Sequence, residues 1–80
     1  MTDDRVFARL RWQARRGMLE LDLLLKRFMD AKLESLAPGE LGRLEEVLRL
    51  EDNELLDLVM GRKQCHDANL KTMVDLIRSA

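Results

Sequence analysis

The chain has 80 residues, a length that allows one small core. Its residues are 46% hydrophobic and 36% charged with a formal net charge of −1, a composition that excludes a disordered chain. One cysteine and one histidine exclude a disulfide framework and a zinc site held by this chain alone. No apolar run approaches the ~20 residues that a membrane span needs, so we expect one cytoplasmic domain over residues 1–80, without membrane insertion.

The first predicted helix begins at Thr2, because a hydroxyl N-cap followed by two acids suits a helix N-terminus. Val6 and Leu10 are spaced i, i+4 and form its apolar stripe. The two arginines at residues 15–16 suit the last turn of a helix, and Gly17 can take the left-handed position that follows. We therefore place the end of this helix at residues 15–16.

The second predicted helix runs from about Met18 to Leu33. Leu23 and Met29 widen its apolar arc, which indicates burial on more than one side. Its main apolar face repeats at i, i+3, i+4 and i+7 and consists of Leu21, Leu24, Leu25 and Phe28.

The third predicted helix starts around Pro38, a residue that fits the first helical position. Glu40 stands where the acid of a capping box would, but Ala37 offers no side-chain oxygen to complete the box. We therefore expect a frayed start. The apolar stripe of this helix consists of Leu41, Leu44, Val47 and Leu48.

Two shorter predicted helices complete the chain. Asp52 is a plausible N-cap for a helix over Leu55 to Met60, and Gly61 ends it. Residues 62–66 form a polar connector, after which Asp67 caps a last helix. The apolar stripe of the last helix consists of Leu70, Met73, Val74 and Ile77. No segment alternates as a strand would, so the sequence predicts an all-α fold, a compact and monomeric bundle of about five short helices.

The sequence does not assemble a catalytic or cofactor site. Cys65 and His66 are adjacent in the connector and lack a third group to orient them. Gly39 and Gly42 lie in a helical segment without the Lys-Ser/Thr of a phosphate-binding loop. We therefore expect no enzyme, no metal and no cofactor bound stably by this chain.

Charge is distributed unevenly along the chain. This pattern fits either the solvated faces of a small bundle or a bipolar surface that orients a partner. Nucleic-acid binding is disfavoured, because the helix after the arginines is too apolar for a groove and the isoelectric point is near 5.8. The first helix carries Arg5, Arg9, Arg11, Arg15 and Arg16, whereas the middle carries Glu40, Glu45, Glu46, Glu51, Asp52, Glu54 and Asp57.

The junction around Gly17 combines a break in the helical pattern with charges on both sides. Trp12 lies just upstream and is either a core residue or an exposed interface anchor; we favour the anchor, because tryptophan and arginine are typical hot-spot residues. Arg16 and Glu20 could contact a partner, or they could cap helix ends or pair with each other. The residues alone leave these alternatives open.

Residues 11–22 (Arg-Trp-Gln-Ala-Arg-Arg-Gly-Met-Leu-Glu-Leu-Asp) resemble the signature of the SdhE/YgfY family, the flavinylation assembly factors of succinate dehydrogenase, related to mitochondrial assembly factor 2. The core Arg16-Gly17-x-x-Glu20 alone is a weak pattern, but Trp12 upstream, Leu21-Asp22 downstream and the chain length make it specific. The resemblance continues through Phe28, Leu36, Glu40, Leu44, Leu48, Asp52, Leu55, Met60, Asp67, Met73, Val74, Leu76 and Ile77.

This resemblance implies a five-helix fold and a partner. Members bind the flavoprotein subunit of succinate dehydrogenase, and of fumarate reductase where a cell has it, and promote covalent attachment of FAD, which the partner carries. Leu58 and Ala37 depart from residues common in the family, an aromatic and a hydroxyl cap, which affects packing and capping. The alternative function is an antitoxin-type protein that antagonises a membrane-associated toxin. The implied partner-binding residues are Arg16, Gly17 and Glu20, with Arg11, Trp12, Arg15 and Asp22 as flanking candidates.

If Gly17 turns the chain so that Arg16 and Glu20 project on one side, Arg16 could clamp a partner carboxylate through two hydrogen bonds while Glu20 accepts from partner donors.

Overall fold

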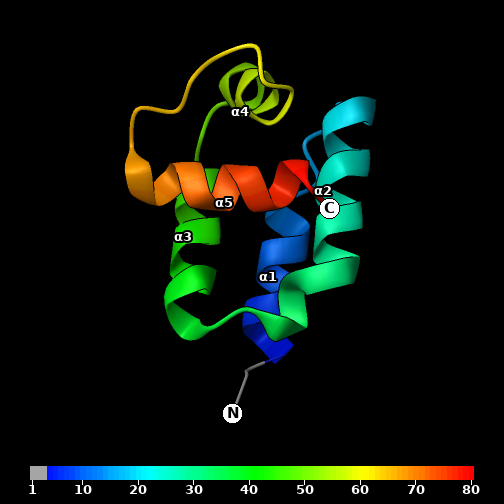
Figure 1. Ribbon diagram of the computed structural model, residues 1–80. Helices are drawn as coiled ribbons and strands as arrows, with labels where there is room; N and C mark the ends of the chain where they lie inside the picture. Colours follow the sequence, from blue (N-terminus) through cyan, green and yellow to red (C-terminus); the bar gives the residue numbers. More distant parts are fainter. Residues whose placement is uncertain (1–3) are drawn as a thin grey trace.

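The computed structural model describes residues 4–80, and that part of the chain is helical without any β-strand (Figure 1). The all-α bundle of about five short helices is therefore confirmed. The expected helix start at Thr2 lies outside the described residues. The elements are α1 (Asp4–Gln13), α2 (Leu19–Lys32), the 3-10 helix η1 (Leu33–Ser35), α3 (Pro38–Leu48), α4 (Asp52–Val59) and α5 (Ala68–Arg78).

The last helix organises the bundle. α5 packs against α2, α3 and α4, and α1 packs against α3. Figure 1 shows α5 crossing in front of the bundle, with α4 viewed end-on above it. α5 therefore joins helices that lie far apart in the sequence.

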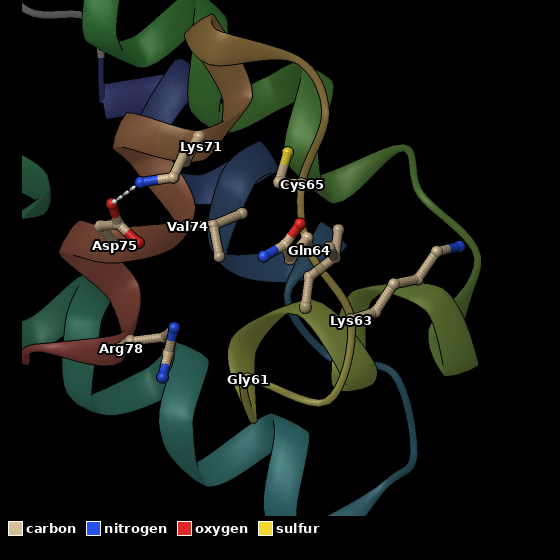
Figure 2. A pocket seen from close by; sticks show the side chains of 9 residues that line it. Gly61, Lys63, Gln64, Cys65, Lys71, Val74, Asp75 and Arg78 are labelled. Atoms are coloured by element: carbon tan, nitrogen blue, oxygen red, sulfur yellow. Dashed lines mark hydrogen bonds and ion pairs between the residues drawn. The ribbon is translucent and has the colours of Figure 1, made fainter.

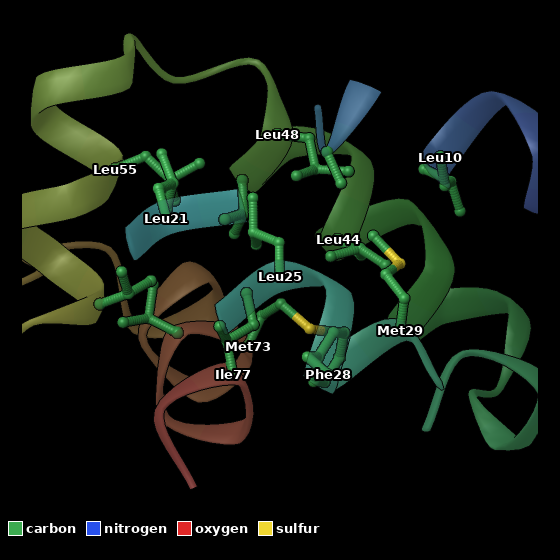
Figure 3. Packing of buried hydrophobic residues seen from close by; sticks show 14 of the residues in the cluster. Leu10, Leu21, Leu25, Phe28, Met29, Leu44, Leu48, Leu55, Met73 and Ile77 are labelled. Atoms are coloured by element: carbon green, nitrogen blue, oxygen red, sulfur yellow. The ribbon is translucent and has the colours of Figure 1, made fainter. Parts of the chain in front are cut away.

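Every α-helix contributes to one apolar core. Figure 3 shows Leu25 and Phe28 of α2 lying against Met73 of α5. Full burial of a side chain as large as Phe28 contributes about 1.5–3 kcal/mol to folding. The fully or almost fully buried residues are Leu10, Ala14, Leu21, Leu25, Phe28, Met29, Leu33, Leu44, Val47, Leu48, Leu55, Leu58, Val59, Met73, Val74 and Ile77.

The predicted wide apolar arc of α2 is confirmed at one residue and wrong at the other. Met29 is buried, whereas the Leu23 side chain is 55% exposed. Residue 23 lies on the outward side of the helix, away from the buried positions 21, 25 and 28. α2 therefore presents apolar surface that the chain itself does not cover.

α1 ends at Gln13, three residues before the predicted end. The last turn closes through hydrogen bonds from the Ala14 N–H to the Leu10 carbonyl at 3.0 Å and from the Arg15 N–H to the Trp12 carbonyl at 3.1 Å. Gly17 does adopt the left-handed conformation, with φ of 78°, but it lies in the linker and not next to the helix end.

The start of α3 is more regular than its sequence suggests. The N–H of Ala37 donates to Oε1 of Glu40 at 2.9 Å, so half of a capping box forms without a capping side chain on Ala37. Pro38 occupies the first helical position, as predicted. The N–H of Leu41 then donates to the Ala37 carbonyl at 3.0 Å, and the expected fraying is absent.

The ends of α4 differ in how well the sequence predicted them. Asp52 is the first residue of the helix and not its N-cap, a position that Glu51 takes without a side-chain hydrogen bond. At the other end Gly61 has φ of 76° and forms a Schellman motif, since the Arg62 N–H bonds the Asp57 carbonyl at 2.8 Å. The carboxylate of Asp52 is thus free for another contact, described below.

Candidate partner-binding surface

The α1–α2 linker is held by a carboxylate from α2. Oδ1 of Asp22 accepts the Arg16 N–H at 2.8 Å, and Oδ2 accepts the Gly17 N–H at 3.1 Å. Both oxygens of one side chain therefore fix two consecutive backbone groups, with Gly17 supplying the left-handed turn between them and α2. Asp22, expected to flank a binding surface, shapes the linker from within the chain.

The Arg16 side chain points into the molecule. Its Nε donates to Oδ1 of Asp52 at 2.7 Å, and the side chain is only 13% exposed. Nη1 donates to the carbonyl of Gln13 at 3.2 Å and to that of Leu48, and Nη2 donates to the carbonyl of Leu50. We call this set the Arg16 hub: the guanidinium, the Asp52 carboxylate and the three carbonyls.

The hub corrects one prediction about Arg16. We expected its guanidinium to project beside Glu20 and to clamp a partner carboxylate through two hydrogen bonds. In the structure the guanidinium binds the Asp52 carboxylate, and two of the carbonyls that it caps lie at the C-terminal ends of α1 and α3. Carbonyls at a helix C-terminus lack partners within the helix and carry partial negative charge, which explains their attraction for a cation.

Glu20 has the opposite environment. It lies in the first turn of α2, is exposed, and among residues 4–80 no hydrogen bond or ion pair engages its carboxylate. The helix dipole stabilises an acid at this position. Glu20 is therefore a charged acceptor that a partner could approach without first breaking an internal contact.

Large exposed apolar side chains lie on α1 and in the first two turns of α2. Trp12 is 70% exposed, and the guanidinium of Arg15 lies over its ring, 5.6 Å from the centroid. Leu19 is 77% exposed and, with Leu23, forms an i, i+4 pair on the outward side of α2. The structure thus places Trp12 where we favoured it, at the surface and outside the core.

A groove of about 300 Å³ lies between α1 and α2. Nη1 of Arg11 and Nζ of Lys26 both bind Asp30, each at 2.9 Å, and link the two helices beside it. The hydrogen bond from Arg11, followed by that from Lys26, lowers the pKa of Asp30 below its ordinary value. The groove is lined by Arg11, Ala14, Arg15, Asp22, Lys26 and Met29.

The structure brings three of the predicted residues, Arg11, Arg15 and Asp22, to the groove, and Arg15 in turn contacts Trp12. We define the α1–α2 surface as the groove together with Trp12, Arg15 and the exposed residues in the first two turns of α2, which are Leu19, Glu20 and Leu23. Gly17 is exposed in the linker between α1 and α2, and a Cβ added there would meet nothing within 4 Å. The Arg16 side chain is outside this surface, since it is largely buried in the hub.

Three contributors were missed by the sequence analysis. Leu19 and Leu23 were assigned to the apolar content of a helix, whereas the structure shows both exposed on the outward side of α2. Asp52 was assigned to a cap, because its partner Arg16 is 36 residues away along the chain. A helical wheel of α2 could have found the two leucines, since residues 19 and 23 lie opposite the stripe at 21, 25 and 28.

A second cleft, of about 430 Å³, lies between α5 and the connector after α4. Figure 2 shows Lys71 turned toward Asp75, to which it is bonded at 3.2 Å, while Lys63 points away from the cleft. Nζ of Lys63 lies 3.5 Å from Glu54. Within residues 4–80 no group of three or more His, Cys, Asp or Glu side chains could hold a metal ion, and no helix is long and apolar enough to cross a membrane.

A family model described as flavinator of succinate dehydrogenase matches residues 8–80. The chain belongs to this family. Among its relatives, the FAD assembly factor SdhE of Pseudomonas aeruginosa is 38% identical over 77 residues, covering 96% of this chain and 92% of the relative. The FAD assembly factor SdhE of Ralstonia nicotianae is 37% identical over 76 residues (90% and 80%), and that of Colwellia psychrerythraea is 43% identical over 70 residues (88% and 77%).

The family resemblance identified from residues 11–22 is therefore confirmed. The relatives are named as FAD assembly factors and not as enzymes. The antitoxin alternative gains no support from these relatives.

Proposed function

We propose that this protein binds the flavoprotein subunit of succinate dehydrogenase through the α1–α2 surface and promotes covalent attachment of FAD to a histidine of that subunit. The observation that carries the proposal is the exposed carboxylate of Glu20, unengaged among the described residues, in a chain that belongs to the flavinator family. Flavoprotein subunits of fumarate reductase are further candidate partners.

Each part of the surface has a role that its chemistry supports. Trp12 supplies a large apolar anchor with little conformational entropy to lose, and Leu19 and Leu23 extend it. Arg15 places a cation over the indole ring and beside the groove. Glu20 accepts hydrogen bonds from partner donors. This combination of an apolar centre with charged neighbours is typical of interface hot spots.

The proposed mechanism requires no catalytic side chain from this protein. The histidine nucleophile and the flavin 8α carbon both belong to the loaded partner, and the reaction needs them aligned. Binding would favour the partner conformation in which they are aligned, because this protein binds that conformation more tightly than others. Each ~1.4 kcal/mol of such preference raises the relative population about tenfold.

The test is a binding measurement between the purified flavoprotein subunit and variants of this protein. Glu20→Gln removes the charge and keeps the shape, and isothermal titration calorimetry should show at least a tenfold loss of affinity, about 1.4 kcal/mol. Glu34→Gln is the matched control, since Glu34 is an exposed acid of η1 that no hydrogen bond or ion pair engages among residues 4–80. Equal affinity for both variants would contradict the proposal.

The remaining expectations belong to the same proposal. The protein acts as a monomer in the cytoplasm, FAD stays with the partner, and this chain does not hold FAD stably. The net charge of −1 is consistent with a protein partner, since nucleic-acid binders usually carry a basic surplus.

A further inference from the structure

We infer that Asp52, which lies outside the Arg16-Gly17-x-x-Glu20 motif, is a positioning residue for the α1–α2 surface. By binding Arg16 it holds the linker in the geometry that presents Glu20, so it sets the affinity for the partner without touching it. This inference rests on the proposed function and adds to it a residue of α4.

The first argument is the geometry of the hub. The contact between Arg16 Nε and Asp52 Oδ1 is short, at 2.7 Å, and charge-assisted, and the arginine side chain is 13% exposed. The other guanidinium donors hold the carbonyls of Gln13, Leu48 and Leu50. One side chain thus joins the C-terminal ends of α1 and α3 to the N-terminal end of α4.

The second argument is the electrostatic balance of the hub. The carbonyls at the two helix ends carry partial negative charge, but among residues 4–80 only Asp52 offers the guanidinium a full opposite charge. Asp52 occupies the first position of α4, where the helix dipole favours the ionised carboxylate. Removing this carboxylate would leave the shielded cation of Arg16 without an ionised partner, and the guanidinium would be free to turn toward water.

The third argument is the path from Asp52 to Glu20. The Arg16 side chain is fixed by Asp52, while its backbone N–H is fixed by Asp22, two residues beyond Glu20 on α2. The two acids therefore bind the same residue, one at its backbone and one at its side chain. When Asp52 releases the side chain, the backbone contacts of Asp22 remain, but the guanidinium is held by uncharged carbonyls alone, and the direction of Glu20 becomes less fixed.

The experiment compares three variants by calorimetric binding to the flavoprotein subunit, well below each melting temperature. Asp52→Asn should weaken binding at least tenfold. Asp57→Asn is the charge-matched control on the same helix, because within the described residues the Asp57 carboxylate pairs only with the exposed Arg62, at 3.7 Å. This variant should bind as tightly as the unsubstituted protein. Val59→Ala is the stability control, since it leaves a cavity in the α4 core and does not touch the hub.

The outcomes separate this inference from the proposed function. Parent-like binding by Asp52→Asn together with weak binding by Glu20→Gln would overturn the inference alone. Parent-like binding by Glu20→Gln would overturn both. If Val59→Ala loses as much affinity as Asp52→Asn, the effect is one of stability and the positioning role is wrong.

A second readout does not require the partner. In proton–nitrogen NMR spectra the Arg16 Nε–H should exchange slowly with water in the parent and in Asp57→Asn, and quickly in Asp52→Ala. Asp52→Glu keeps the negative charge. Compared with Asp52→Ala, it should therefore show slower exchange of the Arg16 Nε–H and a higher affinity for the flavoprotein subunit. Slow exchange retained in Asp52→Ala would show that the carbonyls alone hold Arg16, and the inference would fail.

Discussion

At residue 17 the backbone takes a conformation that residues with a Cβ adopt only at a cost. The φ of Gly17 is 78°, while the space around its missing Cβ is open. Gly17→Ala should therefore destabilise the protein by about 1–2 kcal/mol, the cost of the left-handed region, without any steric clash. Urea denaturation followed by circular dichroism measures this change.

The control for this prediction is Gly42→Ala. Gly42 lies inside α3 and also has open space around it, but its φ is not left-handed. Alanine should stabilise the protein there by about 0.5–1 kcal/mol. If both substitutions changed the free energy of unfolding in the same direction, backbone conformation would not be what distinguishes these two glycines.

The residue scale also shows what local pattern can and cannot predict. The positive φ of Gly17 was expected, because a glycine between two helical patterns usually supplies a left-handed turn. The direction of Arg16 was not, since it depends on carbonyls and a carboxylate more than 30 residues away. The sequence left capping of helix ends open as a role for Arg16, and that is the role that the structure supports.

Among the helices, α5 and α4 begin in different ways. Oδ1 of Asp67 accepts the N–H groups of Asn69 at 2.9 Å and Leu70 at 3.4 Å, so α5 has a true side-chain cap. Asp67→Ala should cost about 0.5–2 kcal/mol of unfolding free energy. Glu51→Ala at the N-cap of α4 should cost far less, because Glu51 makes no capping hydrogen bond. Thermal denaturation of the two variants compares them directly, and equal losses would contradict the assignment.

The link between α1 and α2 has a predictable pH dependence. Hydrogen bonds from Arg11 and then Lys26 lower the pKa of Asp30 in the folded state. Its stabilising contribution is therefore fully present above the pKa of the unfolded chain and is lost as the pH falls through the lower folded pKa. The pair is exposed, so salt should weaken the effect.

Carbon NMR titration of the Asp30 carboxyl group measures this pKa. Arg11→Gln should raise it toward its ordinary value, whereas Arg49→Gln, which removes an exposed arginine paired with Glu45, should leave it unchanged. An Asp30 pKa that does not respond to Arg11→Gln would show that the α1–α2 ion pair does not form in solution.

Over the whole molecule, the core was largely predictable and the surface was not. The stripes of α2, α3 and α5 follow from helical periodicity, which is local, and residues such as Leu25, Leu44 and Ile77 are buried as expected. Leu19 and Leu23 stay exposed because they lie opposite the buried stripe of α2, which a helical wheel shows. The Arg16 hub, by contrast, joins the ends of three helices, and no local pattern specifies it.

The central claim is that the Glu20 carboxylate on the α1–α2 surface serves flavin attachment in the partner. The most direct measurement is in-gel flavin fluorescence of the denatured succinate dehydrogenase flavoprotein. The flavoprotein is taken from cells in which this gene is deleted, and from the same cells after the unsubstituted gene (the parent), Glu20→Gln or Glu34→Gln has been reintroduced. We predict a fluorescent band with the parent and with Glu34→Gln, and a band reduced to background with Glu20→Gln. A full band with Glu20→Gln, or one that persists without the gene, would contradict the claim.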